Sequence, residues 1–145
     1  MINISNDKEA STDQVKTQAD AIIYFLQKLD IEMVDDILYD NITYQDFKKG
    51  IFIQKLGVAL DEFIGSGDDF LRCYKGFCKE KLCGYRCDGY SFIGNHSNNY
   101  MDLIIKVENG QVLDMYECSS FKNLDHPLNK KRRVVIHKII LDLPF

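Results

Sequence analysis

Residues 100–112, YMDLIIKVENGQV, contain the pattern that decides the fold. Two sets of side chains alternate along residues 100–107: Met101, Leu103, Ile105 and Val107 form the more apolar set, and Tyr100, Asp102, Ile104 and Lys106 form the other. This period of two predicts a β-strand with one face in the core and the other closer to solvent. Asn109-Gly110 then suits a two-residue type I′ turn, because both residues tolerate a positive φ. The stretch therefore predicts an antiparallel hairpin.

Further strands surround this hairpin. The period of two starts near Asp69 and predicts four strands, at Phe70–Cys78, Gly84–Ile93, Tyr100–Val107 and Gln111–Ser119. A loop is predicted over Lys122–Lys131. The tail Val134–Phe145 is apolar enough to add a fifth strand or to pair with a second chain, since an apolar strand at a sheet edge invites a partner.

The part of the chain before Asp69 shows the periodicity of helices and not that of strands. Ser11 or Thr12 is a plausible N-cap of a first helix, whose apolar face extends to Leu29. A second, short helix is predicted over Ile31–Leu38. The run Ile42–Gln45 then favours a short extended segment.

A third helix has the clearest pattern and is predicted from about Phe47 to Ile64. Its core-facing stripe consists of Phe52, Leu56, Ala59, Leu60 and Phe63. Gly57 lies inside this helix, where glycine costs ~1 kcal/mol relative to alanine. We therefore expect another backbone to pack closely against Gly57.

The order of these elements, helices first and then consecutive strands, predicts the α+β class, with a curved antiparallel sheet wrapped around the N-terminal helices and enclosing a cavity. A chain of 145 residues is long enough for one domain with its own core, so we expect a single domain over residues 1–145. Residues 1–10 are expected to be frayed, and residues 126–145 to form an extra strand or a dimer contact.

The charge of the chain argues against a nucleic-acid partner. The net charge is −4, whereas nucleic-acid binding requires a basic face. One basic run, Lys130-Lys131-Arg132-Arg133, could serve as a localisation or anion patch, but four such charges beside an acidic body usually form a solvated loop.

The hydropathy of the chain predicts no membrane partner. No segment approaches the ~20 consecutive apolar residues of a membrane span. Residues 1–13 are polar and acidic and lack the apolar core of an export signal. We therefore expect a cytoplasmic protein whose five cysteines are reduced.

The cysteines and glycines predict neither a metal nor a cofactor. Zinc ligands usually occur in pairs two to four residues apart and close together in space. Gaps of four, four and three residues separate the cysteines here, which lie on two predicted strands and their hairpin, where alternation sends them to different faces: Cys73, Cys78, Cys83 and Cys87. Gly65-Ser66-Gly67 precedes a strand, whereas phosphate-cradling loops lead into a helix.

Several short stretches together resemble the nuclear-transport-factor-2-like superfamily. They are Phe25-Leu26, Asp30-Ile31-Glu32, the run from Leu38 to Asp46, and Asn109-Gly110-Gln111-Val112. The resemblance covers roughly Gln18 to Phe121 and implies the cone-shaped fold of ketosteroid isomerases and SnoaL-type polyketide cyclases. Members of this superfamily include enzymes, binding modules and scaffolds, so the fold alone does not choose among these functions.

The resemblance also implies a catalytic arrangement. Isomerases of this fold place a carboxylate base after the first short strand, where Asp46 lies, and an acid on a later strand, near Asp102. Tyr24 on the first helix would complete the oxyanion site. The residues themselves allow other roles: Asp46 is a natural N-cap for the third helix, Asp102 lies on the polar side of its strand unless a bulge reverses it, and Tyr24 can be a core or rim aromatic.

Aromatic residues are dense on the predicted sheet, and several should line the cavity. The candidates for ligand binding are Tyr44, Tyr90, Phe92 and Tyr116. The leading hypothesis is a domain that binds a small apolar molecule. The alternatives are a proton-transfer enzyme acting on a cyclic or carbonyl substrate, and a non-catalytic protein-interaction scaffold. We expect a homodimer formed through the outer face of the sheet.

Overall fold

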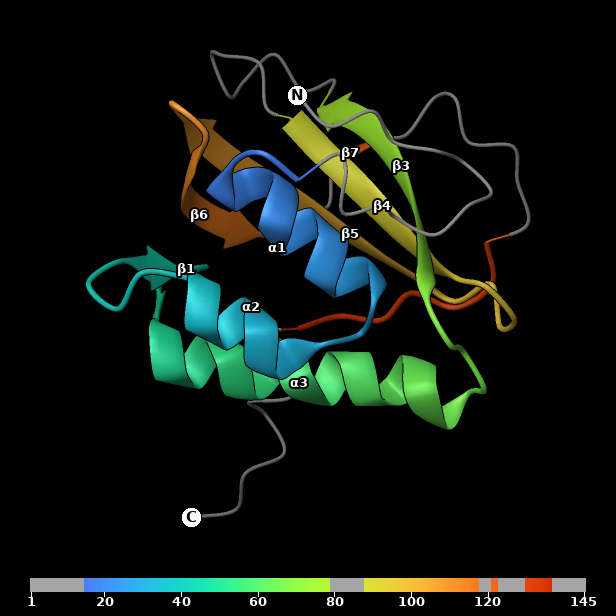
Figure 1. Cartoon of the computed structure of the whole chain (residues 1–145). Helices are drawn as coiled ribbons and strands as arrows, with labels where there is room; N and C mark the ends of the chain where they lie inside the picture. Colours follow the sequence, from blue (N-terminus) through green and yellow to red (C-terminus); the bar gives the residue numbers. More distant parts are fainter. Residues whose placement is uncertain (1–14, 79–87, 118–120, 123–129, 137–145) are drawn as a thin grey trace.

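The structure, a computed structural model, describes residues 15–78, 88–117, 121–122 and 130–136. Its elements, in chain order, are α1 (Gln18–Gln27), α2 (Ile31–Ile37), β1 (Thr43–Tyr44), β2 (Phe47–Lys48), α3 (Lys49–Gly65), β3 (Leu71–Cys78), β4 (Asp88–Gly94), β5 (Tyr100–Glu108), β6 (Gln111–Tyr116) and β7 (Phe121–Lys122). Figure 1 shows α1 crossing the sheet, with α2 between α1 and α3. The predicted α+β class, with helices preceding a curved antiparallel sheet, is confirmed.

The main sheet has the strand order β6-β5-β4-β3-β7, and all of its pairings are antiparallel. The four predicted strands are present as β3 to β6. Phe121 and Lys122 were not predicted to be a strand, but they pair with Cys78 and Phe77 at the far edge as β7. Strand β6 ends at Tyr116, earlier than predicted.

The β5–β6 hairpin has the predicted turn. Asn109 and Gly110 have φ values of 53° and 79°, as a type I′ turn requires. A register shift between Lys106 and Val107 was not predicted, and Val107 is 42% exposed instead of lying in the core. A bulge of this kind changes the facing of the residues beyond it.

Both faces of β5 are buried from Met101 to Ile105, which corrects the prediction that one face is closer to solvent along this part of the strand. Asp102 is only 6% exposed, and Ile104, on the same face, is also buried. In β4, Ser91 and Ile93 pair with Asp102 and Tyr100 and are buried as well. Alternation predicts which face a residue takes, but it does not predict whether further chain covers that face.

Helix α1 starts later than predicted, because Val15 and Lys16 are not helical. Its N-cap is Thr17, whose hydroxyl accepts a hydrogen bond from the Asp20 amide (3.1 Å), rather than Ser11 or Thr12, which lie outside the described residues. A cap oxygen there satisfies one of the amides that a helix start leaves unpaired.

Two glutamines fix α1 on the rest of the fold. The Gln18 side chain donates to the Ile37 carbonyl (2.8 Å) and accepts from the Val112 amide (2.7 Å). The buried Gln27 donates to the Leu71 carbonyl (2.9 Å). Helix α1 is therefore bonded to α2, β6 and β3.

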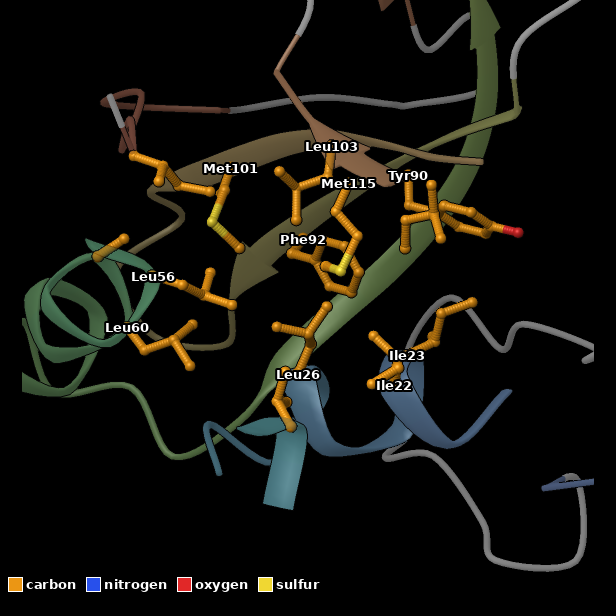
Figure 2. Close-up of a cluster of buried hydrophobic side chains, with 14 of the residues drawn as sticks. Ile22, Ile23, Leu26, Leu56, Leu60, Tyr90, Phe92, Met101, Leu103 and Met115 are labelled. Atoms are coloured by element: carbon orange, nitrogen blue, oxygen red, sulfur yellow. The ribbon is translucent and has the colours of Figure 1, made fainter. Parts of the chain in front are cut away.

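The core lies between the helices and one face of the sheet, and Figure 2 shows side chains from both filling it. The predicted stripe of α3 is buried throughout: Phe52, Leu56, Ala59, Leu60 and Phe63. Sheet residues facing this stripe and α1 include Phe92, Met101, Leu103 and Met115.

Gly57 has a looser environment than predicted. The nearest atom to an added Cβ is Ile31 Cγ1 at 3.5 Å, an ordinary contact with a side chain and not with a backbone.

Replacing Gly57 by Ala is therefore expected to raise the free energy of unfolding by about 0.5–1 kcal/mol, because alanine loses less backbone entropy in a helix interior. Urea unfolding followed by circular dichroism measures this change. A lower stability would mean that a close backbone contact exists after all.

Residues 130–136 fold back onto the domain. The Tyr100 amide donates to the Arg132 carbonyl (3.0 Å), and the Val134 amide donates to the Tyr100 carbonyl (2.7 Å). Tyr100 and Arg133 form an isolated parallel bridge. Most of the predicted strand Val134–Phe145 lies outside the described residues. Val134 and Ile136 are buried in the core cluster, so this part of the tail contacts its own chain. Residues 1–14 and 137–145 lie outside the described part.

Candidate ligand-binding cleft

Three of the four aromatic residues proposed to bind a ligand lie in the packed core. Tyr44, Tyr90 and Phe92 are almost fully buried among core side chains. The rings of Tyr90 and Phe92 are 6.4 Å apart, whereas Tyr44 contacts the Phe52 ring at 5.5 Å and donates to the Tyr39 carbonyl (3.2 Å). Tyr116 pairs with Ile104 on the opposite face of the sheet.

Asp46 lies in the turn of the β1–β2 hairpin and is exposed. Gln45 and Asp46 both have positive φ, 51° and 66°, so the chain turns here and α3 begins only at Lys49. The N-cap is Lys48, which provides no side-chain hydrogen bond. The prediction that Asp46 caps the third helix is therefore wrong.

Asp102 and Tyr24 lie on different sides of the sheet. Asp102 accepts a hydrogen bond from Ser91 Oγ (2.6 Å) on the face that points away from the core. Tyr24 is half-buried on α1, with its ring 4.9 Å from the Phe25 ring. Within the described part of the chain, no hydrogen bond or ion pair links Asp46, Asp102 and Tyr24. The proton-transfer arrangement gains no support from their positions.

A cleft of about 510 Å³ lies elsewhere, where α2, the β1–β2 hairpin and the start of α3 meet. Its lining comes from three segments: Asp35 of α2; Asp40, Asn41, Ile42 and Thr43 of the following loop and β1; and Lys48, Lys49 and Gly50 of β2 and α3. Most of these residues are polar. Ligand sites commonly measure ~300–1,000 Å³, so the cleft has the size of a small-molecule site.

Lys49 holds the walls of this cleft together. Its ammonium donates to the Leu38 carbonyl (3.0 Å) and to Asp40 Oδ1 (2.8 Å), and it lies 3.3 Å from Asp35 Oδ1. Burial opposes the charge of this ammonium, but the hydrogen bonds that it donates to Asp40 and Asp35 outweigh burial and raise the pKa of Lys49. The Lys49 ammonium thus links α2, the following loop and α3, and its N–H donors are directed to groups of the protein itself.

The first turn of α3 forms part of the cleft wall. Because Lys48 provides no capping oxygen, the first amides of this 17-residue helix have no side-chain acceptor from the cap. Lys49 and Gly50 of this turn are part of the cleft lining. The residues that line the cleft therefore include an amide side chain, a hydroxyl and two carboxylates beside the first turn of α3.

The hairpin wall of the cleft is fixed to β6. The Gln45 amide donates to Asp114 Oδ1 (3.0 Å), and the Gln45 side chain exchanges two hydrogen bonds with Glu117. Burial raises the pKa of Asp114, and the negative charge of nearby Asp46 adds to this effect. These contacts position the hairpin rigidly beside the sheet.

The described residues contain no group of three His, Cys, Asp or Glu side chains placed to hold a metal ion. Cys73 is buried, and burial raises the pKa of its thiol far above the ordinary value, so it is not a thiolate at neutral pH. The side chain of Cys78 and residues Cys83 and Cys87 lie outside the described part, so the absence of zinc there stays a prediction.

Sequence reasoning missed the cleft because it placed the start of α3 two residues early. One signal was available: the pair Lys48-Lys49 follows the acidic residues Asp35 and Asp40, and opposite charges across a loop indicate a bridging contact. Periodicity does not detect such contacts, since they join segments outside the regular elements.

Comparisons of this chain with protein-family models, curated proteins and solved structures match nothing. In the described ranges, the structure contains no helix with the length and apolar character needed to cross a membrane.

Proposed function

We propose that this chain is a non-catalytic domain that binds a small polar molecule in the cleft between α2, the β1–β2 hairpin and α3. The observation that carries the proposal is the ligand-sized cleft, most of whose lining residues have polar side chains. The order of elements supports a further proposal, that the domain is a cone-shaped member of the nuclear-transport-factor-2-like superfamily.

The same geometry changes the chemistry expected of the ligand. The interior that a cone would offer to an apolar ligand is filled by side chains such as Phe92, Leu60 and Met115. The cleft lining instead includes Asn41 and Thr43, whose side chains recognise polar groups. A polar ligand therefore fits better than an apolar one.

A second candidate, a protein-interaction scaffold, has one observation in its favour. Helix α3 exposes Ile51 and Val58, which lie about two turns apart on one side of the helix, at 46% and 43% of their surfaces. Apolar side chains on one exposed helix side favour a protein partner. A homodimer stays a prediction; the outer face of β4 and β5, through which it was expected, has Ile93 and Ile104 buried within the chain.

Gly50 provides the test of ligand binding. An added Cβ at Gly50 meets no atom within 4 Å, so side chains are accommodated there without a clash. We expect Gly50→Phe to place a ring in the cleft and to weaken binding by about tenfold or more, equivalent to ~1.4 kcal/mol. Gly50→Ala, which adds a single methyl group, is the matched control and should keep the affinity.

The measurement is a ¹H–¹⁵N NMR titration of the full chain with a set of free amino acids, monosaccharides and dicarboxylic acids. A ligand of the cleft should shift the amides of Thr43, Lys49 and Gly50 saturably. Shifts confined to core amides such as those of Tyr90 and Phe92, or equal binding by both variants, would contradict the proposal. So would the absence of any saturable shift across the set.

A further inference from the structure

A second feature lies on the face of the sheet that points away from the helices. Arg72 pairs with Ile93, Ile93 pairs with Tyr100, and Tyr100 forms the parallel bridge with Arg133. Directly paired residues of neighbouring strands have their side chains on the same face. Met101, which follows Tyr100, points into the core, so this row of four side chains points to the opposite face.

Both arginines of this row have unused donors. The Nε atoms of Arg72 and Arg133 are buried and lack a hydrogen-bond partner. Arg72 Nη2 donates to Asn98 Oδ1 (2.6 Å), and the Arg133 side chain has no hydrogen bond or ion pair with the described residues. A guanidinium has five N–H donors, and a buried donor without an acceptor is destabilising. Each guanidinium is therefore short of acceptors, although both residues are only half-buried.

A third cation lies over Tyr100, the member of this row that bridges to Arg133. Lys130 Nζ is 4.7 Å from the centroid of the Tyr100 ring and 4.0 Å from Asp102 Oδ1. That Asp102 oxygen already accepts the Ser91 hydroxyl (2.6 Å). Three cations thus occupy this corner of the sheet with one carboxylate near them, in a chain whose net charge is −4.

The backbone fixes the positions of these cations. The Lys131 amide donates to the Asn98 carbonyl (2.9 Å), next to the paired residues Tyr100 and Arg132. The Arg132 side chain points to the other side and pairs with Glu62 of α3 (3.1 Å). The basic run is therefore held against the sheet and divided between its two sides, unlike a solvated loop.

We propose that Arg72, Lys130 and Arg133 form a binding site for an oxyanion, a phosphate or carboxylate group, on the face of the sheet opposite the helices. A guanidinium can donate two parallel N–H bonds to the oxygens of such a group, and its unpaired Nε is one of the donors in that arrangement. The anion would supply the acceptors that both arginines lack. This site is separate from the cleft, so it stands or fails independently of the function proposed above.

The test uses the full chain at low ionic strength and isothermal titration calorimetry. Three probes distinguish the sources of the group: inorganic phosphate, acetate, and phosphatidylcholine vesicles containing phosphatidylserine. We expect saturable binding of at least one probe, weakened by about tenfold or more in Arg133→Gln and in Arg72→Gln. Lys131→Gln is the matched control, because Lys131 is an exposed member of the same basic run and is not part of the proposed site.

A conservative variant and the thermal midpoint provide a second test, which remains informative if the Gln variants fold poorly. Arg133→Lys keeps the positive charge but removes the planar guanidinium and its paired N–H donors, so we expect it to weaken binding as well. If the patch acted through its charge alone, Arg133→Lys would keep the affinity of the unmodified protein. The bound probe should raise the thermal midpoint of the unmodified protein and of Lys131→Gln, but not that of Arg133→Gln. No binding of any probe, or an equal loss in Lys131→Gln and Arg133→Gln, would overturn the proposal.

Discussion

Replacing Phe92 by Ala is expected to lower the free energy of unfolding by about 3–5 kcal/mol, measured by urea denaturation. The Phe92 side chain has no exposed surface and lies in the core cluster between the sheet and the helices. Truncation would remove its buried apolar surface and leave a cavity that the surrounding side chains fill only partly.

This variant also separates two interpretations of Phe92. From the sequence, Phe92 was predicted to line a ligand cavity. In that position truncation would enlarge an existing cavity, and the free energy of unfolding of the unliganded protein would fall much less. Phe92→Leu is the control, because a smaller apolar side chain at the same position should cost less than ~1.5 kcal/mol. A loss below that level for Phe92→Ala would mean that the interior is not packed around this ring.

A Gly94→Ala variant is expected to lose about 3 kcal/mol of stability, because an added Cβ would overlap the Asp68 carboxylate. This buried carboxylate organises the turn between β4 and β5: it accepts the His96 amide (2.8 Å), the Ser97 amide (2.7 Å) and the Ser97 hydroxyl (2.6 Å). A methyl group would displace it and break these charge-assisted hydrogen bonds.

Two further variants test the cause. Gly65→Ala should leave stability nearly unchanged, because an added Cβ there meets no atom within 4 Å. The double variant Asp68→Ala, Gly94→Ala should lose clearly less than the sum of the single losses, since both changes remove the same contacts. Strict additivity of the two losses in thermal or urea unfolding would contradict the proposed clash.

Much of the fold could be predicted from the sequence, because local periodicity reports which face of an element is apolar. The stripe from Phe52 to Phe63 and the Asn109-Gly110 turn are examples, since each depends on neighbours in the chain. The start of α3 could not be predicted in this way. Gln45 adopts a positive φ, for which glutamine carries no strong sequence signal, and the resulting turn delays the helix to Lys49.

The candidate sites were harder to predict, because they depend on segments that are distant in the sequence. Alternation placed Asp102 on the face away from the core, but its burial depends on Ser91 and on the position of Lys130. The cleft likewise requires Lys49 to reach Asp35 and Leu38 across a loop. Neither contact has a local pattern, so only the folded structure reveals it.

The burial of Val134 and Ile136 has a consequence for the order of events during synthesis. The ribosome adds only ~5–20 residues per second, so the apolar faces of α1 and α3 are made well before the residues that complete their core. Contacts between distant parts of a chain also form slowly, because a long loop must close first. The apolar faces of the nascent helices therefore stay incompletely covered until synthesis reaches Ile136.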